Sequence, residues 1–172
     1  DISGRIISKY FRKKIKIEVK SDNTPVTKVD KESEKKIRDL IIKKAPECGF
    51  YGEETGKFNT NNEYVWVVDP LDGTKGFITG KPLFCTLIGL MKNNKPYIGI
   101  INQPILNERW QGIANKESRF NNSKIRTRKC KKLRGLRMYA TSPMMFGGKN
   151  QKVYKSVRSK IGETLCSATR IK

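Results

Sequence analysis

The sequence of 172 residues contains no histidine, and it has only 16 acidic residues against 37 lysines and arginines. Its four cysteines, at positions 48, 85, 130 and 166, are far apart and show none of the paired spacings of zinc sites. We therefore expect no zinc site, and we predict free thiols in a reducing compartment. Because no apolar run is long enough to span a bilayer and no signal-like segment is present, the sequence predicts a soluble cytoplasmic protein without a membrane span.

Positive charge is the most unusual property of the composition, with a net charge of +21. Such a surface favours polyanions, including nucleic acid and phosphorylated small molecules. The basic residues are spread through the chain, with the densest run at 124–132, and no nucleic-acid-binding signature accompanies them. Two interpretations stay open: a coding bias that decorates a solvated surface, and weak, non-specific binding to nucleic acid.

Hydrophobic patterning predicts a layered domain of helices and strands. Apolar residues recur at helical spacing over residues 1–12, and Thr27 with Asp30 three residues later fits a capping box for a helix that continues to about Lys44. Apolar runs with turn-forming residues between them then predict an antiparallel meander with strands at 84–91, 97–102, 109–115 and 124–128. Two helices ahead of a meander indicate an α+β domain rather than alternating βαβ units.

An apolar run at residues 64–68 leads directly into two carboxylates, a glycine and a hydroxyl. The run predicts a buried strand, and Pro70 is expected to end its hydrogen-bonding ladder at once. The turn that follows can aim Asp69 and Asp72 at one Mg²⁺ ion. If a helix begins at Thr74, its free N–H groups can hold a phosphate. The alternative is a pair of ordinary acidic turns.

Three separated elements carry a resemblance to a known family. They are Asp30, the Glu53-Glu54 pair, and the run Asp-Pro-Leu-Asp-Gly-Thr at 69–74. In this order they resemble the signature of the inositol monophosphatase superfamily of Mg²⁺-dependent, lithium-sensitive phosphatases. Segments 72–90, 101–110 and 141–146 look most like its histidinol-phosphatase branch. The resemblance implies a layered αβαβα sandwich, of which this chain holds mainly the first half, with two N-terminal helices packed on an antiparallel sheet.

The resemblance also implies a role for each residue of the signature. It assigns Mg²⁺ to Glu53, Asp69, the Leu71 carbonyl and Asp72, and phosphate to Asp72, Gly73 and Thr74. It gives Glu53 and Thr74 the activation of water, with Asp30 orienting Thr74. On the residues alone, Asp30 is as well explained as a helix cap. Glu54 and Lys20 are secondary candidates, and Lys20 could reach a phosphate or a metal-bound anion.

The implied activity is Mg²⁺-dependent hydrolysis of a small phosphomonoester, with histidinol phosphate as the expected substrate. The alternatives are an inositol-1-phosphate phosphatase, a bisphosphate nucleotidase, and a truncated, catalytically inactive relative that binds polyanions. Family members continue through a second domain and are expected to be homodimers at full length, whereas the resemblance fades here after Gly162. We therefore expect a metal- and phosphate-binding domain at 1–135 and the start of a truncated second domain at 136–172.

Overall fold

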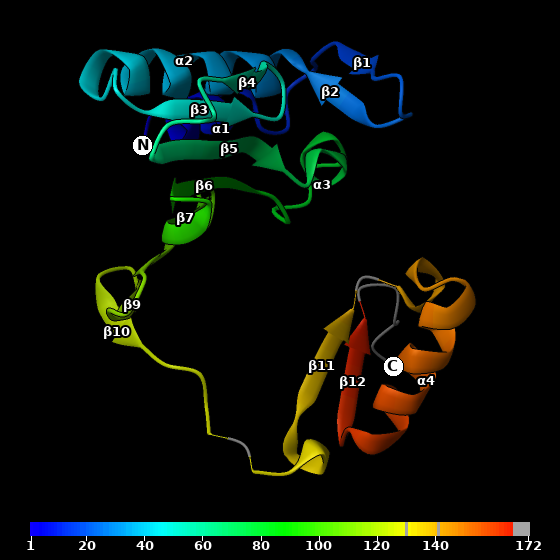
Figure 1. Cartoon of the computed structure of the whole chain (residues 1–172). Coiled ribbons are helices and arrows are strands. Elements are labelled where there is room, and N and C mark those ends of the chain that lie inside the picture. The colour runs from blue at the N-terminus through cyan, green and yellow to red at the C-terminus, as the bar shows by residue number, and fades with distance from the viewer. Residues whose placement is uncertain (130, 141, 167–172) are drawn as a thin grey trace. The chain divides into compact units, whose positions relative to one another are not determined.

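The computed structural model describes residues 1–129, 131–140 and 142–166, and Figure 1 shows how its elements are arranged. Cys130 in the densest basic run and Thr141 in the third resembling segment lie outside the described residues. The chain divides into two compact units, Asp1–Arg126 and Thr127–Lys172. The domain boundary expected after residue 135 stays a prediction.

An eight-stranded sheet is the frame of the first unit, with the strand order β10-β9-β8-β7-β6-β5-β3-β4. All neighbouring strands are antiparallel except β3 and β5, which are parallel. The strands are β3 (Gly49–Gly52), β4 (Gly56–Phe58), β5 (Tyr64–Asp72), β6 (Cys85–Lys92), β7 (Lys95–Gln103), β8 (Glu108–Ile113), β9 (Ser118–Phe120) and β10 (Ser123–Ile125). The hairpin turns at Asn93-Asn94 and Asn121-Asn122 have positive φ angles at both residues, which two-residue turns between twisted strands require.

Two helices, α1 (Ile2–Tyr10) and α2 (Lys28–Lys44), cover one face of this sheet. The Ser3 hydroxyl of α1 accepts a hydrogen bond from Thr86 on β6, and the cluster around Ile37 of α2 includes Ile88. Residues 86 and 88 are two apart on one strand and therefore share a face. The α+β class and the packing of two N-terminal helices on a sheet are thus confirmed.

Two buried clusters hold the helices on the sheet. One contains Ile7, Val29, Leu71, Phe77 and Phe84, and the other contains Ile37, Phe50 and Val68. Leu71 is only 1% exposed, so its side chain is anchored in the core while its main chain lies in the last part of β5, between Asp69 and Asp72. Full burial of such a side chain contributes about 1.5–3 kcal/mol. The core therefore fixes the position of residues 69–74, which we call the acidic turn.

The expectation that Pro70 ends its strand at once was wrong. β5 continues to Asp72, with a register shift between Asp69, which pairs with Leu87, and Asp72, which pairs with Cys85. Proline cannot donate to a ladder, but a bulge leaves its residue outside the regular pairing. The Pro70 carbonyl still accepts a hydrogen bond from the Thr86 hydroxyl, at 2.9 Å. Asp69 and Asp72 therefore lie on the same strand, β5.

The remaining elements are short. In the first unit, β1 (Ile17–Val19) and β2 (Pro25–Thr27) form a hairpin just before α2, and α3 (Thr74–Ile78) follows β5. The second unit contains η1 (Leu133–Gly135), β11 (Arg137–Ala140), η2 (Pro143–Met145), α4 (Gly148–Lys160) and β12 (Glu163–Cys166). β11 and β12 are parallel neighbours. Among the described residues, none of the helices combines the length and apolar character needed to cross a bilayer.

Candidate active site

The start of α2 brings Asp30 against Thr74. The Asp30 carboxylate accepts hydrogen bonds from the Thr27 amide at 2.8 Å and the Thr27 hydroxyl at 2.6 Å, which completes the expected capping box. Its other oxygen lies 3.1 Å from the Thr74 hydroxyl, which is equally close to the Leu71 carbonyl. Asp30 is only 2% exposed. One buried carboxylate therefore caps a helix and contacts the hydroxyl of the acidic turn, so both interpretations of Asp30 have a geometric basis.

The acidic turn opens into a small cavity of about 230 Å³. Its walls are Thr24, Pro25, Glu53, Asp69, Leu71, Asp72, Gly73, Thr74 and Lys75. Gly73 has a φ of +89°, and a Cβ there would lie 2.6 Å from the Leu83 carbonyl oxygen. Only glycine fits that backbone without strain. The signature residues Glu53, Asp69, Leu71, Asp72, Gly73 and Thr74 thus line one cavity, although larger hollows lie elsewhere in the first unit.

Negative charge accumulates in this cavity. Burial raises the pKa of Asp69 to about 7, and the carboxylates of Glu53 and Asp72 add to the shift. The Leu71 amide donates a hydrogen bond to Asp69 at 3.1 Å and opposes the shift. Crowded carboxylates disfavour each other's ionised form, and a nearby cation relieves that repulsion. The cavity is therefore electrostatically suited to a cation.

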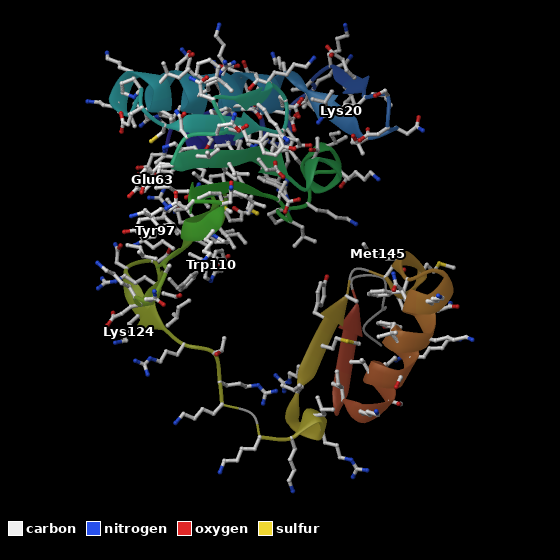
Figure 2. All side chains as sticks on the ribbon, viewed as in Figure 1. Lys20, Glu63, Tyr97, Trp110, Lys124 and Met145 are labelled. Carbon is white, nitrogen blue, oxygen red and sulfur yellow. The ribbon has the colours of Figure 1, made fainter. Side chains whose placement is uncertain are left out.

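Lys20 (labelled in Figure 2) lies in the turn between β1 and β2 and forms ion pairs with the two glutamates of the signature. Its ammonium nitrogen lies 2.9 Å from Glu53 and 2.7 Å from Glu54. Desolvation alone would lower the pKa of Lys20, but the hydrogen bonds to Glu54 and Glu53 raise it overall. Burial raises the pKa of Glu54 although Lys20 opposes that shift. Lys20 therefore contacts the signature carboxylates directly, whereas the sequence suggested a contact with a bound phosphate or anion.

The donor set fits a hard divalent cation. Asp69, Asp72 and the Leu71 carbonyl offer oxygen ligands around one cavity, and Mg²⁺ binds through one or two carboxylates while keeping waters and substrate oxygens. Within the part of the chain that the structure describes, no group of three or more histidine, cysteine, aspartate or glutamate side chains is already assembled to hold a metal ion. Glu53 contacts Lys20 through Oε1 and also lies close enough to Asp69 to raise its pKa, so it already faces the cavity.

Three lining residues have no counterpart in the sequence-based set: Thr24, Pro25 and Lys75. Thr24 and Pro25 reach the cavity through the β1–β2 hairpin, a placement that no local pattern reveals. Glu34 was also missed. Its carboxylate is fully buried and accepts hydrogen bonds from the amides of Glu54 and Thr55. Its position four residues after Asp30, on the same face of α2, is the signal that could have found it.

Comparison with known proteins identifies relatives of this arrangement. The sequence model of the inositol monophosphatase family matches residues 1–164. The chain is 46% identical over 163 residues to the bifunctional phosphatase IMPL2, chloroplastic, of Arabidopsis thaliana, covering 94% of this chain and 47% of that protein. It is 36% identical over 124 residues to the histidinol-phosphatase of Chlorobaculum parvum, covering 72% and 48%.

Solved structures agree with the sequence comparisons. An inositol monophosphatase from Zymomonas mobilis superposes with a TM-score of 0.83 at 37% identity, covering 96% of this chain and 64% of that one. The chain spans about half the length of the curated relatives it matches. Members of the matched family are phosphatases and generally depend on a metal ion. A family match over nearly the whole chain, with the signature residues around one cavity, shows that the chain belongs to the inositol monophosphatase family.

Proposed function

We propose that the protein carries the metal- and phosphate-binding part of a Mg²⁺-dependent phosphomonoesterase. The observation that carries this proposal is the single cavity lined by Glu53, Asp69, Leu71, Asp72, Gly73 and Thr74. Its carboxylates and its main-chain carbonyl are the ligand types that Mg²⁺ prefers. The family membership makes a phosphomonoester the natural substrate class.

Each residue has a distinct task in this proposal. Glu53, Asp69, Asp72 and the Leu71 carbonyl would hold Mg²⁺, and the ion would supply charge neutralisation at the phosphoryl oxygens. The Thr74 hydroxyl, 3.1 Å from Asp30, orients the attacking water, and Glu53 accepts its proton. The amides of Gly73 and Thr74 bind the phosphate, because the absence of a Cβ at Gly73 lets the ligand approach the backbone. No covalent intermediate with the protein is required.

Lys20 is the counter-ion of Glu53 in this proposal. In the structure the Glu53 carboxylate is 2.9 Å from the Lys20 ammonium nitrogen. This contact uses Oε1 of Glu53, and the same side chain lies close enough to Asp69 to raise its pKa. The second partner of Lys20 is Glu54, at 2.7 Å. The lysine therefore balances part of the negative charge of both glutamates.

Histidinol phosphate is the substrate we propose, with an inositol phosphate or a nucleoside bisphosphate as alternatives. The support is the match to a histidinol-phosphatase and to a bifunctional phosphatase, together with Lys75 at the cavity wall. Residues that select the leaving alcohol are expected in the half of the relatives that this chain does not span. We also propose a cytoplasmic location and, for the full-length protein, a homodimer.

A phosphate-release assay with Mg²⁺ tests the activity and its substrate. We expect a chain extended to the length of its relatives to hydrolyse histidinol phosphate faster than inositol 1-phosphate or a nucleoside bisphosphate. The 172-residue chain should be slow on all three. Fast turnover by the 172-residue chain would show that the second half is dispensable. An extended chain inert on all three substrates would refute the phosphatase proposal.

A second candidate function is non-specific binding of nucleic acid. Between Ser118 and Gly162 the sequence has 14 lysines and arginines and no acidic residue. Figure 2 shows side-chain nitrogens along the chain that follows Lys124. A stretch without compensating carboxylates attracts phosphate backbones more strongly than a mixed surface does. This function needs neither the cavity nor a metal, so it can be tested independently.

A further inference from the structure

The turn between β3 and β4 carries Glu53 and Glu54. Its main-chain amides donate hydrogen bonds to two kinds of acceptor, a carbonyl of the sheet and a side-chain carboxylate. β3 pairs with β5 as far as Gly52, which lies opposite Val68, and the Glu53 amide adds one more hydrogen bond to the Val68 carbonyl, at 3.1 Å. Beyond that point the sheet no longer supplies acceptors for the next two amides. These part-buried amides, of Glu54 and Thr55, find an acceptor on another element.

Glu34 on α2 supplies that acceptor. Its two carboxylate oxygens accept hydrogen bonds from the Glu54 amide at 2.8 Å and the Thr55 amide at 2.7 Å. The side chain is 0% exposed. Burying a carboxylate is costly unless it is hydrogen-bonded, and bonds from N–H groups to an ionised acceptor are about twice as strong as neutral ones. The turn is therefore fastened to α2 by a pair of strong contacts.

The Glu34 carboxylate occupies the space that a side chain at Gly52 would need. A Cβ on Gly52 would fall 2.3 Å from Oε1 and 2.7 Å from Oε2 of Glu34. The absence of a side chain at Gly52 is thus what admits the carboxylate beneath the turn. Asp30, one helical turn earlier, accepts a hydrogen bond from the side-chain hydroxyl of Thr74. Two buried carboxylates of α2 therefore hold the two loops that face each other across the cavity.

We propose that Glu34 is a positioning residue of the metal site, whose carboxylate fixes the Glu53–Thr55 turn so that Glu53 can join Asp69 and Asp72 around one cation. This inference rests on the proposed function and deepens it. Glu34 does not line the cavity, and it acts through the backbone of the turn. Outer residues that orient metal ligands typically change metal affinity by about 10–100-fold.

Calorimetry with Mg²⁺ on the 172-residue chain tests this inference from both sides of the contact. Glu34→Gln replaces one acceptor oxygen by a donor, and Gly52→Ala displaces the unchanged carboxylate. We expect each variant to lose about 10-fold or more in Mg²⁺ affinity. Glu32→Gln, an exposed site on the same helix, and Gly99→Ala, where a Cβ meets nothing within 4 Å, should bind as the wild type does.

Two further readouts separate positioning from general stability. In the metal-free protein, amide hydrogen exchange in Glu34→Gln should accelerate at Glu54 and Thr55 while the Leu71 amide keeps its protection. In a Glu53→Gln background, adding Glu34→Gln should cost little more Mg²⁺ affinity, because Glu34 acts through Glu53. Additive losses in the double variant would overturn the inference and assign Glu34 a general structural role.

The outcomes also distinguish this inference from the proposed function. Wild-type Mg²⁺ affinity retained by both Glu34→Gln and Gly52→Ala would overturn only the role of Glu34. A wild-type chain that binds no Mg²⁺ would overturn the proposed metal site, and the role of Glu34 with it.

Discussion

Asp69 is the residue with the most strongly perturbed acid–base behaviour in the cavity. Burial raises its pKa from 3.8 to about 7, so the metal-free folded state holds a proton that the unfolded state releases between these values. A carboxyl whose pKa is raised on folding stabilises the fold at low pH and costs stability as the pH rises. We therefore predict that the metal-free chain loses stability between about pH 4 and pH 7.

The change Asp69→Asn should remove this pH dependence. Denaturant unfolding without metal should find the variant more stable than the wild type at pH 8 and nearly equal to it at pH 4, because only the ionised form is penalised. Asp39→Asn, an exposed site on α2, is the control and should follow the wild type. An Asp69→Asn curve parallel to the wild type at every pH would contradict the raised pKa.

The contribution of Asp30 to the free energy of unfolding can be tested separately. An amide in its place can accept both Thr27 hydrogen bonds through its one oxygen, but it then turns a donor NH₂ group toward the Thr74 hydroxyl, which donates to Asp30 in the structure. We expect Asp30→Asn to lower the free energy of unfolding by about 1–3 kcal/mol. Thermal unfolding measures the loss, and Asp39→Asn again serves as control. A change below about 0.5 kcal/mol would mean that the contact between Asp30 and Thr74 contributes little to stability.

The sequence was enough to choose candidate site residues, but not to find the contacts that these residues make. Asp69 and Asp72 could be selected because carboxylates beside glycine and a hydroxyl form a local pattern, and Glu53 was selected through the family resemblance. Glu34 and the bonds of Lys20 to Glu53 and Glu54 could not, since they join residues about 20 to 34 positions apart. Such contacts depend on how the helix and the hairpin pack, which no spacing encodes.

The turn between β5 and α3 is the element on which the phosphate site depends. Gly73→Ala places a Cβ 2.6 Å from the Leu83 carbonyl oxygen at a φ of +89°. We expect a loss of at least about 1–2 kcal/mol in unfolding free energy, together with weaker phosphate binding. Chemical denaturation and phosphate titration measure both effects. Gly99→Ala, on β7, is the matched control and should cause neither; equal behaviour of the two variants would refute the strain argument.

The extent of the elements was largely predictable where local signals agreed. The capping box marked the start of α2 at Lys28, and α3 covers Thr74–Ile78 as expected. Pro70 was misread because a proline normally ends a strand, whereas the bulge between Asp69 and Asp72 accommodates it here. A bulge depends on the neighbouring strand, so β5 alone could not reveal it.

For the whole molecule, the parallel pairing of β3 with β5 lay beyond the sequence patterns. β4 follows β3 in the chain but lies at the edge of the sheet, so β5 joins β3 from the other side. The charge distribution, in contrast, can be read directly. Of the net charge of +21, a large share belongs to the acid-free stretch from Ser118 to Gly162.

That distribution predicts how the protein meets nucleic acid. Binding to unrelated DNA or RNA sequences should be of similar strength and should fall steeply between 50 and 200 mM salt, as counterion release requires. Fluorescence anisotropy across a salt series measures this dependence. Replacement of Lys152, Lys155 and Arg158 of α4 by glutamine should reduce the salt slope, whereas glutamine at Lys35, Lys36 and Lys43 of α2 should reduce it less. Sequence-selective binding that survives high salt would contradict the non-specific interpretation.

Calorimetric titration of the 172-residue chain with Mg²⁺ tests whether Asp69 and Asp72 form a metal site. We predict one site whose affinity rises from pH 6 to pH 8, because bound Mg²⁺ must displace the proton that Asp69 holds below its pKa of about 7. Asp69→Asn should abolish the binding and Asp39→Asn should leave it unchanged. Equal Mg²⁺ binding by the wild type and Asp69→Asn would show that Asp69 is not a ligand and that the proposed metal site is wrong.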